Sequence, residues 1–273
     1  MKYKHILGIA CVFVLIGILC VQNFSYALGF GQNITIYDNT SSLTNVWYQS
    51  QEDNEVEPGN TRAQEWDLEG FFLDGYTLTV IGGFNFADGA NTITSGDIFL
   101  DIDGDAIYGG NQTKPNHRSN GLIDLNNTYG YDYAIKLNFD NNEFRVFDIS
   151  NTDKTTSVYY SQNDWSSPWK YRANSNGNTS TIDTGTLTYY CPSNLINTGF
   201  QGYSSNSDHY GFSVDLSFLP PGTSFISHFT IKCGNDNLMG KGTLPVPEPA
   251  TLLLFGSGLL GFAAFTRKKI NKG

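Results

Sequence analysis

The chain has few basic residues outside its two ends, and this scarcity limits the partners that it can attract. Between Leu28 and Pro247 there are ten Lys and Arg against 25 Asp and Glu, a net charge of −15, whereas the whole chain has −10. The difference arises because six of the sixteen basic residues lie in the terminal segments. A field of this sign repels nucleic acid and anionic lipid headgroups. We therefore expect no nucleic-acid partner, and cations are the ions that this part should attract.

Sequence signatures of common enzymes are also missing from this part of the chain. Between residues 28 and 247 there is no P-loop, no Gly-x-Gly-x-x-Gly turn and no Gly-x-Ser-x-Gly elbow, and the histidines are not at zinc-ligand spacing. A pair of carboxylates for glycoside hydrolysis stays open as an alternative, because 25 acids supply many pairs. The pattern favours a protein that is not an enzyme.

Helical periodicity is absent as well, since no window of this part shows convincing 3.6-residue spacing. Short runs of β-branched and aromatic residues alternate instead with Gly, Asn and Pro. The clearest hairpin has alternating residues 131–139, a turn at 140–142 and a second strand at 143–149. Repeated short strands predict an all-β fold, an antiparallel and jelly-roll-like β-sandwich over residues 28–244.

The first 27 residues predict a signal peptide. Lys2 and Lys4 precede an apolar run from Ile6 to Val21, and Ser25-Tyr26-Ala27 provides the small residues that signal peptidase accepts. We expect signal peptidase to cut after Ala27 and the remaining chain to be exported.

Cysteines are few, and two of the four, Cys11 and Cys20, lie in the expected signal peptide. The other two, Cys191 and Cys233, each fall on the apolar face of an expected strand. In an oxidising compartment such a pair predicts a disulfide. On the loop-entropy model this bridge would stabilise the fold by about 3 to 4 kcal/mol.

Asp97 opens an expected strand, Ile98–Ile102, which contains Asp101 and runs directly into Asp103 and Asp105. Carboxylates at alternate positions project to one side of an extended chain, and Gly104 allows a sharp turn, so their oxygens would converge on a hard cation such as Ca²⁺. The spacing departs from an EF-hand loop, which needs Gly at the sixth position. The alternative is a turn in which the Asp side chains bond to backbone N–H groups.

Two tryptophans, Trp165 and Trp169, lie in a stretch rich in Asn, Ser and Thr. Rings that the core does not need would stack on the flat faces of sugars, which predicts a glycan-binding surface. The alternative is that these rings cover one end of the sandwich.

One asparagine triplet, Asn126-Asn127-Thr128, has Asp124 two residues before the first asparagine and fits the extended acceptor for bacterial N-glycosylation. Other Asn-x-Ser/Thr triplets begin at Asn33, Asn39, Asn111 and Asn178. In an Asn- and Thr-rich chain such triplets arise by chance, so they only permit the modification.

The last residues combine three features. The segment Val246-Pro247-Glu248-Pro249 is followed by the uncharged, apolar run Ala250–Thr266 and then by Arg267-Lys268-Lys269. A run of this length predicts a single transmembrane helix at the short end of the usual range, and the basic cluster should stop transfer and stay in the cytoplasm.

This tail, over residues 245–273, resembles the PEP-CTERM sorting signal of Gram-negative bacteria. The resemblance implies an inner-membrane precursor that an exosortase cuts close to Pro247-Glu248-Pro249, with the mature form at the cell surface or in the extracellular matrix. A plain anchor that is never cut is the alternative. The hypothesis for function is a non-enzymatic surface protein associated with exopolysaccharide or biofilm. A carbohydrate-binding module and a secreted glycan-active enzyme are the competing hypotheses.

Overall fold

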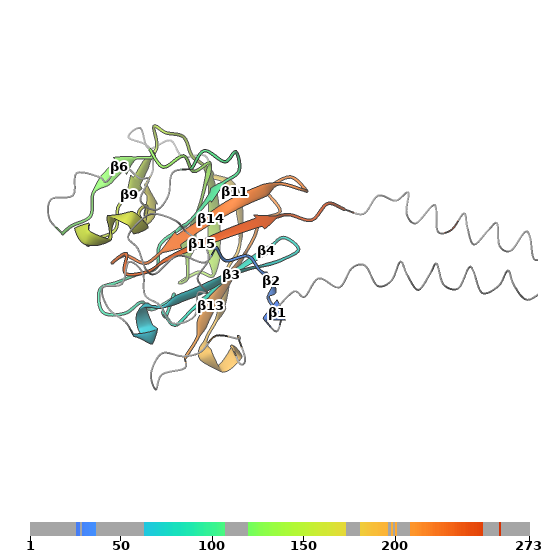
Figure 1. Ribbon diagram of the computed structural model, residues 1–273, viewed down its shortest axis with the longest axis horizontal. Coiled ribbons are helices and arrows are strands. Elements are labelled where there is room, and N and C mark those ends of the chain that lie inside the picture. The colour runs from blue at the N-terminus through green and yellow to red at the C-terminus, as the bar shows by residue number, and fades with distance from the viewer. Residues whose placement is uncertain are drawn as a thin grey trace, which may run out of the picture.

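The computed structural model describes residues 26–27, 29–36, 63–106, 120–172, 181–195, 198, 200, 208–247 and 257. These residues form two six-stranded sheets that pack face to face, here called sheet A and sheet B, and a small three-stranded sheet at one end (Figure 1). Every strand pair among them is antiparallel. The predicted all-β antiparallel sandwich is therefore confirmed.

Sheet A begins with a meander of four consecutive strands and is extended by two later ones, in the order β1-β2-β3-β4-β13-β12. The strands are β1 (Tyr26–Ala27), β2 (Gly31–Asn33), β3 (Leu68–Asp74), β4 (Thr77–Gly82), β12 (Thr188–Tyr190) and β13 (Tyr210–Asp215).

Sheet B is built on the same plan, a meander extended by a later hairpin, in the order β11-β8-β7-β5-β14-β15. The expected hairpin of residues 131–149 is present as β7 paired with β8, and Asn142 has the positive φ of 53° that its tight turn requires. The strands are β5 (Ile98–Asp101), β7 (Tyr133–Asn138), β8 (Glu143–Asp148), β11 (Thr181–Thr186), β14 (Ser224–Thr230) and β15 (Asn237–Thr243).

The small sheet, β6 (Asp124–Asn126), β9 (Lys154–Thr156) and β10 (Lys170–Arg172), is formed by insertions into the meander of sheet B. Its strands lie between β5 and β7 and between β8 and β11 in the chain, in the spatial order β10-β9-β6. Short 3₁₀ turns occur at η1 (Gln64–Trp66), η3 (Ser161–Ser166) and η4 (Pro192–Asn194). In sheet B, β14 returns after a long connection to lie beside β5, so β14, β5, β7 and β8 have the order of a Greek key. The jelly-roll-like part of the expectation stays a prediction.

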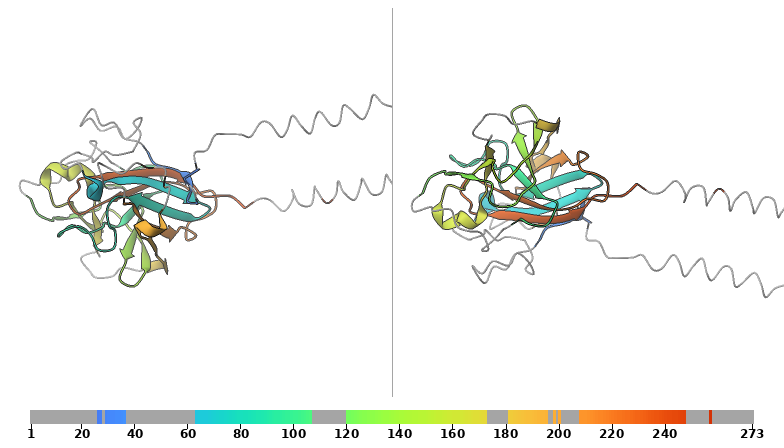
Figure 2. Two further views of the ribbon diagram at one scale, coloured as in Figure 1. Left: turned by 90° about the horizontal axis from the view of Figure 1, so that it is seen from below. Right: turned by 90° about the horizontal axis from the view of Figure 1, so that it is seen from above.

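The small sheet lies at the end of the sandwich opposite to the one from which β15 leads out (Figure 1). The η3 turn, which connects β9 to β10 and is drawn in yellow, lies at the same end of the sandwich in both further views (Figure 2). The small sheet and the chain's exit are therefore at opposite ends of the molecule.

One side of the sandwich is closed by the segment that continues β2. Ile34 N donates to Phe71 O of sheet A at 2.9 Å, while Ile36 N donates to Met239 O of sheet B at 2.8 Å. Lys241 N returns a bond of 2.8 Å to Ile34 O. Residues 34–36 thus bond to β3 of sheet A and to β15 at the edge of sheet B, so this segment bridges the two sheets.

The opposite side is closed by a strand that changes sheets. Leu187 alone separates β11 in sheet B from β12 in sheet A, and its side chain is buried. Its N–H donates to Asn142 O at 2.9 Å, which fixes the crossing against the β7–β8 turn.

Aromatic rings fill the space between the two sheets. Phe86, Phe212 and Phe229 form a triangle with centroid separations of 5.0, 5.7 and 5.5 Å, and all three are buried. Such tilted and edge-on pairs are worth about 0.5 to 1.5 kcal/mol each beyond the area that they bury. These rings join β13 to β14 and hold the sheets together.

A second core lies on the other face of sheet B, beneath the small sheet. Ile98 and Leu100 of β5 point into the main core, whereas Phe99 between them belongs to the second cluster. Sheet B is therefore covered on both faces, and all four residues of β5 are buried. The members of the second cluster are Phe99, Tyr129, Tyr131, Ala134, Phe147, Ile149 and Tyr171.

His228 of β14 packs against this second core. Its ring stacks on Tyr131 with a centroid separation of 5.6 Å, and its Nε2 donates to the carbonyl oxygen of Pro168 at 2.9 Å. Complete burial lowers the pKa of His228 to about 4, although the bond to Pro168 opposes this shift. The imidazole is consequently neutral in the folded protein at pH 7.

The structure shows no disulfide between Cys191 and Cys233, which contradicts the predicted bridge. Cys191 follows β12 at the edge of sheet A and lies 3.1 Å from Ser193 Oγ, whereas Cys233 follows β14 of sheet B and is buried in the main core. The alternation of apolar and polar residues correctly predicted that Cys233 lies on a buried face. It gave no information on which sheet contains the strand of each cysteine. Burial raises the pKa of the Cys233 thiol to about 11, so this thiol stays protonated.

The buried imidazole makes stability depend on pH. Since the folded pKa of about 4 lies below the ordinary 6.5, the unfolded chain binds more protons between these values. The contribution of His228 is complete above pH 6.5 and is lost as the pH falls to about 4, a loss of about 3 kcal/mol in the free energy of unfolding. Urea titrations across this range measure it.

The matched variant is His228→Leu, which should be less stable at neutral pH but should lose less stability on acidification. The comparison is needed because burial raises the pKa of Glu69 and of Asp97. These two carboxyl groups favour the folded state as the pH falls, whereas His228 favours the unfolded state. Equal slopes for the two proteins between pH 6.5 and 4 would contradict a neutral buried imidazole.

Candidate functional site

The acidic loop after β5 is folded by its own side chains. Gly104 takes the positive φ of 86° that the turn needs, and Asp101 Oδ1 accepts a bond of 2.8 Å from Gly104 N. Asp101 Oδ2 accepts a bond of 3.3 Å from Ala106 N, and Asp103 Oδ1 one of 3.2 Å from Asp105 N. The loop therefore contains the Asp-stabilised turn that was the alternative interpretation of this segment.

A third carboxylate joins the loop from a different strand. Asp132 immediately precedes β7, and its Oδ2 accepts a bond of 2.7 Å from Ile102 N. One carboxylate oxygen from each of Asp101, Asp103 and Asp132 lies within 4.8 Å of the other two. We call these three residues the acidic cluster. Sequence reasoning missed Asp132, and the pairing of β5 with β7, Leu100 opposite Tyr133, is the signal that places it beside Asp101.

Two of the predicted ligands lie outside the acidic cluster. Asp97 is four residues before Asp101 on an extended segment, about 13 Å away at the usual rise of a strand, so the two carboxylates cannot share an ion. Asp97 is buried instead and accepts a bond of 2.9 Å from Tyr171 N. Asp105 lies against Gly130, where an added Cβ would be 2.6 Å from its Oδ1.

The negative charge of the cluster is not neutralised by the described part of the protein. Within the described ranges, none of Asp101, Asp103 and Asp132 forms an ion pair with Lys or Arg. Partial burial raises the pKa of Asp132, and the neighbouring charges of Asp103 and Asp101 raise it further. Three carboxylates around one point are the ligands that a hard divalent cation takes, so these residues fit Ca²⁺.

The two tryptophans differ in their exposure. Trp169 is buried, its Nε1 donates to Thr94 O at 3.3 Å and Lys170 Nζ lies 5.0 Å from its ring centroid. Its ring therefore covers one end of the sandwich and offers no free face to a sugar, which corrects that part of the prediction. Trp165 in η3 is half-buried.

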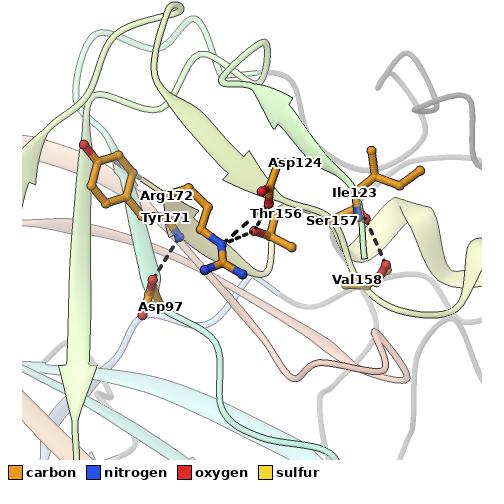
Figure 3. A network of polar contacts seen from close by, with 8 residues as sticks. All are labelled: Asp97, Ile123, Asp124, Thr156, Ser157, Val158, Tyr171 and Arg172. Carbon is orange, nitrogen blue, oxygen red and sulfur yellow. Dashed lines mark hydrogen bonds and ion pairs between the residues drawn. The ribbon is translucent and has the colours of Figure 1, made fainter. Parts of the chain in front are cut away.

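A polar network holds the small sheet together and ties it to sheet B (Figure 3). Thr156 Oγ1 donates to Asp124 Oδ1 at 2.6 Å and accepts from Arg172 Nε at 2.9 Å, while Arg172 Nε lies 3.5 Å from Asp124 Oδ1. The bond from Tyr171 N to Asp97 then joins β10 to the start of β5 (Figure 3). This network links all three strands of the small sheet.

The chain leaves the fold directly before the Pro-Glu-Pro triplet. Leu244 is buried and its N–H donates to Thr223 O at 2.9 Å, and Tyr76 Oη donates to Pro245 O at 3.2 Å. Val246 and Pro247 are exposed. One residue, Val246, therefore separates the last held residue from the triplet.

The rest of the predicted tail lies outside the described residues, except for Ser257. It comprises Glu248, Pro249, the span Ala250–Thr266 and the basic residues Arg267, Lys268 and Lys269. Among the residues that are described, no helix has the length and apolarity needed to cross a membrane.

Comparison with known proteins identifies the C-terminal segment of the chain. No curated protein and no solved structure matches this chain. Residues 245–268 match the family model of the PEP-CTERM protein-sorting motif, so the chain carries this sorting signal, which implies an exported protein that is targeted to an exosortase.

Proposed function

We propose that this protein is a non-enzymatic surface protein of a Gram-negative bacterium that an exosortase processes and that associates with exopolysaccharide or the biofilm matrix. The observation that carries the proposal is the sorting motif, which begins where the sandwich ends. Signal peptidase would remove residues 1–27, and with them β1, which lies at the edge of sheet A beside β2. The precursor would be held in the inner membrane by residues 250–266 until it is cut.

A structural role for the sandwich is supported by the partners of its buried acids. Asp236 Oδ2 accepts a bond of 2.5 Å from Leu68 N and its Oδ1 one of 2.7 Å from Asn237 N, so it connects sheet A to sheet B. Glu69 Oε1 accepts a bond of 3.0 Å from Gln64 Nε2 and lies 3.0 Å from His209 Nε2. Asp97 binds the small sheet in the same way. Each of these carboxylates fixes a part of the fold.

The sorting proposal predicts that the chain is shortened in its own cell. Wild-type protein recovered from the envelope or the medium should have an intact mass that ends near Pro247. Changing Pro247, Glu248 and Pro249 to Ala should abolish this processing, because the triplet is the part of the signal that the enzyme reads.

Lys241→Ala, an exposed change on β15, is the matched control and should leave processing unchanged. A wild-type mass that extends to Gly273 would contradict the proposal and support a permanent anchor.

Calcium is the cofactor that we propose for the acidic cluster. Asp101, Asp103 and Asp132 would supply three carboxylate oxygens, and the net charge of −15 over residues 28–247 would draw cations to the surface. The bound ion would join the loop after β5 to the start of β7.

Calcium should therefore raise the melting temperature through mass action on the folded state, by about 5 to 10 °C at a concentration roughly 100-fold above Kd. Asp103→Asn and Asp132→Asn should lose most of this shift, because each removes a charged ligand and keeps an oxygen for the backbone bond. Asp140→Asn, an exposed change in the β7–β8 turn, should retain it. If neither calcium nor a chelator changes the melting temperature of the wild-type protein, the proposal is contradicted.

A carbohydrate-binding module is the second candidate function, and the half-buried Trp165 in η3 is the ring that favours it. Binding to a glycan array should then fall at least tenfold in Trp165→Ala, because a stacked ring contributes most of the contact with a sugar face. Trp165→Phe should retain part of the binding. A protein that binds no glycan on the array would leave the structural role as the working function.

A further inference from the structure

Strand β6 lies at the edge of the small sheet, with β9 on one side and no paired strand on the other among the described residues. This sheet is at the end of the sandwich opposite to the chain's exit (Figure 1). The β6 edge therefore lies at the end of the domain opposite to the point where the chain leaves toward the sorting signal (Figure 1).

The sequence of β6 contains the acceptor pattern described above, and the strand exposes its three recognised residues. Asp124, Asn126 and Thr128 are all exposed, while Asn127 between the last two is buried and donates through Nδ2 to Tyr131 O at 2.9 Å. Residues two apart on a strand share a face, so the acid, the asparagine and the threonine point to solvent together. Thr128 N donates to Asn126 O at 2.7 Å and forms a tight turn within the triplet.

The side-chain amide of Asn126 is held by its oxygen and has its nitrogen free. Lys154 Nζ donates to Asn126 Oδ1, whereas Asn126 Nδ2 makes no hydrogen bond to the described part of the chain. A glycan on Asn is attached to this nitrogen. The folded domain therefore presents the reacting atom without requiring a contact of that atom to break.

We propose that Asn126 is the acceptor of an N-linked glycan in the exported protein. The donor is a lipid diphosphate-linked oligosaccharide, and an oligosaccharyltransferase of the envelope carries out the transfer. The bond between C1 of the first sugar and the diphosphate oxygen breaks, a bond forms between C1 and Asn126 Nδ2, and the amide loses one proton. The lipid diphosphate leaves. The step needs export of the chain and does not depend on cleavage by the exosortase.

A second triplet in the described residues provides an internal comparison. Asn33-Ile34-Thr35 has Gly31 in place of the acid two residues before the asparagine. Its threonine hydroxyl is used by the fold, because Thr35 Oγ1 accepts a bond of 2.9 Å from Phe71 N, whereas Thr128 is exposed. Among the Asn-x-Ser/Thr triplets of the chain, the one that begins at Asn126 has an acid two positions before its asparagine. Asn126 should be modified and Asn33 should not.

The test is peptide mass spectrometry of the protein isolated from the envelope and medium of the producing cell. The peptide that contains Asn126 should carry a glycan mass increment at that residue. Asn126→Gln and Thr128→Val should lose it completely, the latter with the acceptor still present, and Asp124→Asn should reduce occupancy at least tenfold. Asn33→Gln should leave it unchanged. A melting curve for each variant separates loss of the acceptor from loss of the fold.

An unmodified Asn126 peptide in wild type would overturn the proposal, as would an increment on Ser or Thr of that peptide that survives Asn126→Gln. Because occupancy is measured on precursor and processed chains alike, a failure of sorting and a failure of glycosylation are seen separately.

Discussion

Burial of both faces of sheet B is the constraint on which the rest of the structure depends. In β5 the side chains of Ile98 and Leu100 fill the main core, so Phe99 is forced to the outer face, where it would be exposed to water without a cover. The small sheet provides that cover. Because it is built from insertions between strands of sheet B, it is attached by the same chain whose apolar face it hides. The polar network of Asp97, Asp124 and Arg172 then fixes it in place.

This double burial also sets the chemistry of the polar groups beneath the small sheet. Burial keeps the His228 imidazole neutral at pH 7. Burial also raises the pKa of Asp97, whose carboxyl group accepts a hydrogen bond from the backbone of β10. The acidic loop marks the border of this buried region. Asp101 is buried and bound to its own turn, while Asp103 is exposed, so the same loop passes from a structural to a solvent-facing role within two residues.

Local pattern in the sequence predicted the class of the fold and its clearest hairpin, because alternation and turn residues act over short distances. Local pattern could not predict the order of the strands in the sheets. The order of the strands in each sheet, the disulfide and the set of Asp ligands all depend on which strands are neighbours. Asp132 is the clearest case, since it is 31 residues from Asp101 in sequence and becomes its neighbour through the pairing of β5 with β7. The prediction that Trp169 binds a glycan was wrong for a related reason. The polar stretch around this residue covers a second core, which the alternation of apolar and polar residues did not reveal.

The way in which the chain leaves the fold has a mechanical consequence. A force applied to the segment after Pro245 acts along β15, which is matched with β14 over seven residue pairs and is bonded on its other side to residues 34–36. Antiparallel hydrogen bonds lie perpendicular to their strands, so a pull along β15 loads them together and does not open them one after another. Since only residues 244–246 lie between β15 and the Pro-Glu-Pro triplet, tension from an attached C-terminus reaches this ladder through a short connection. The sandwich is thus placed to resist shear as a unit.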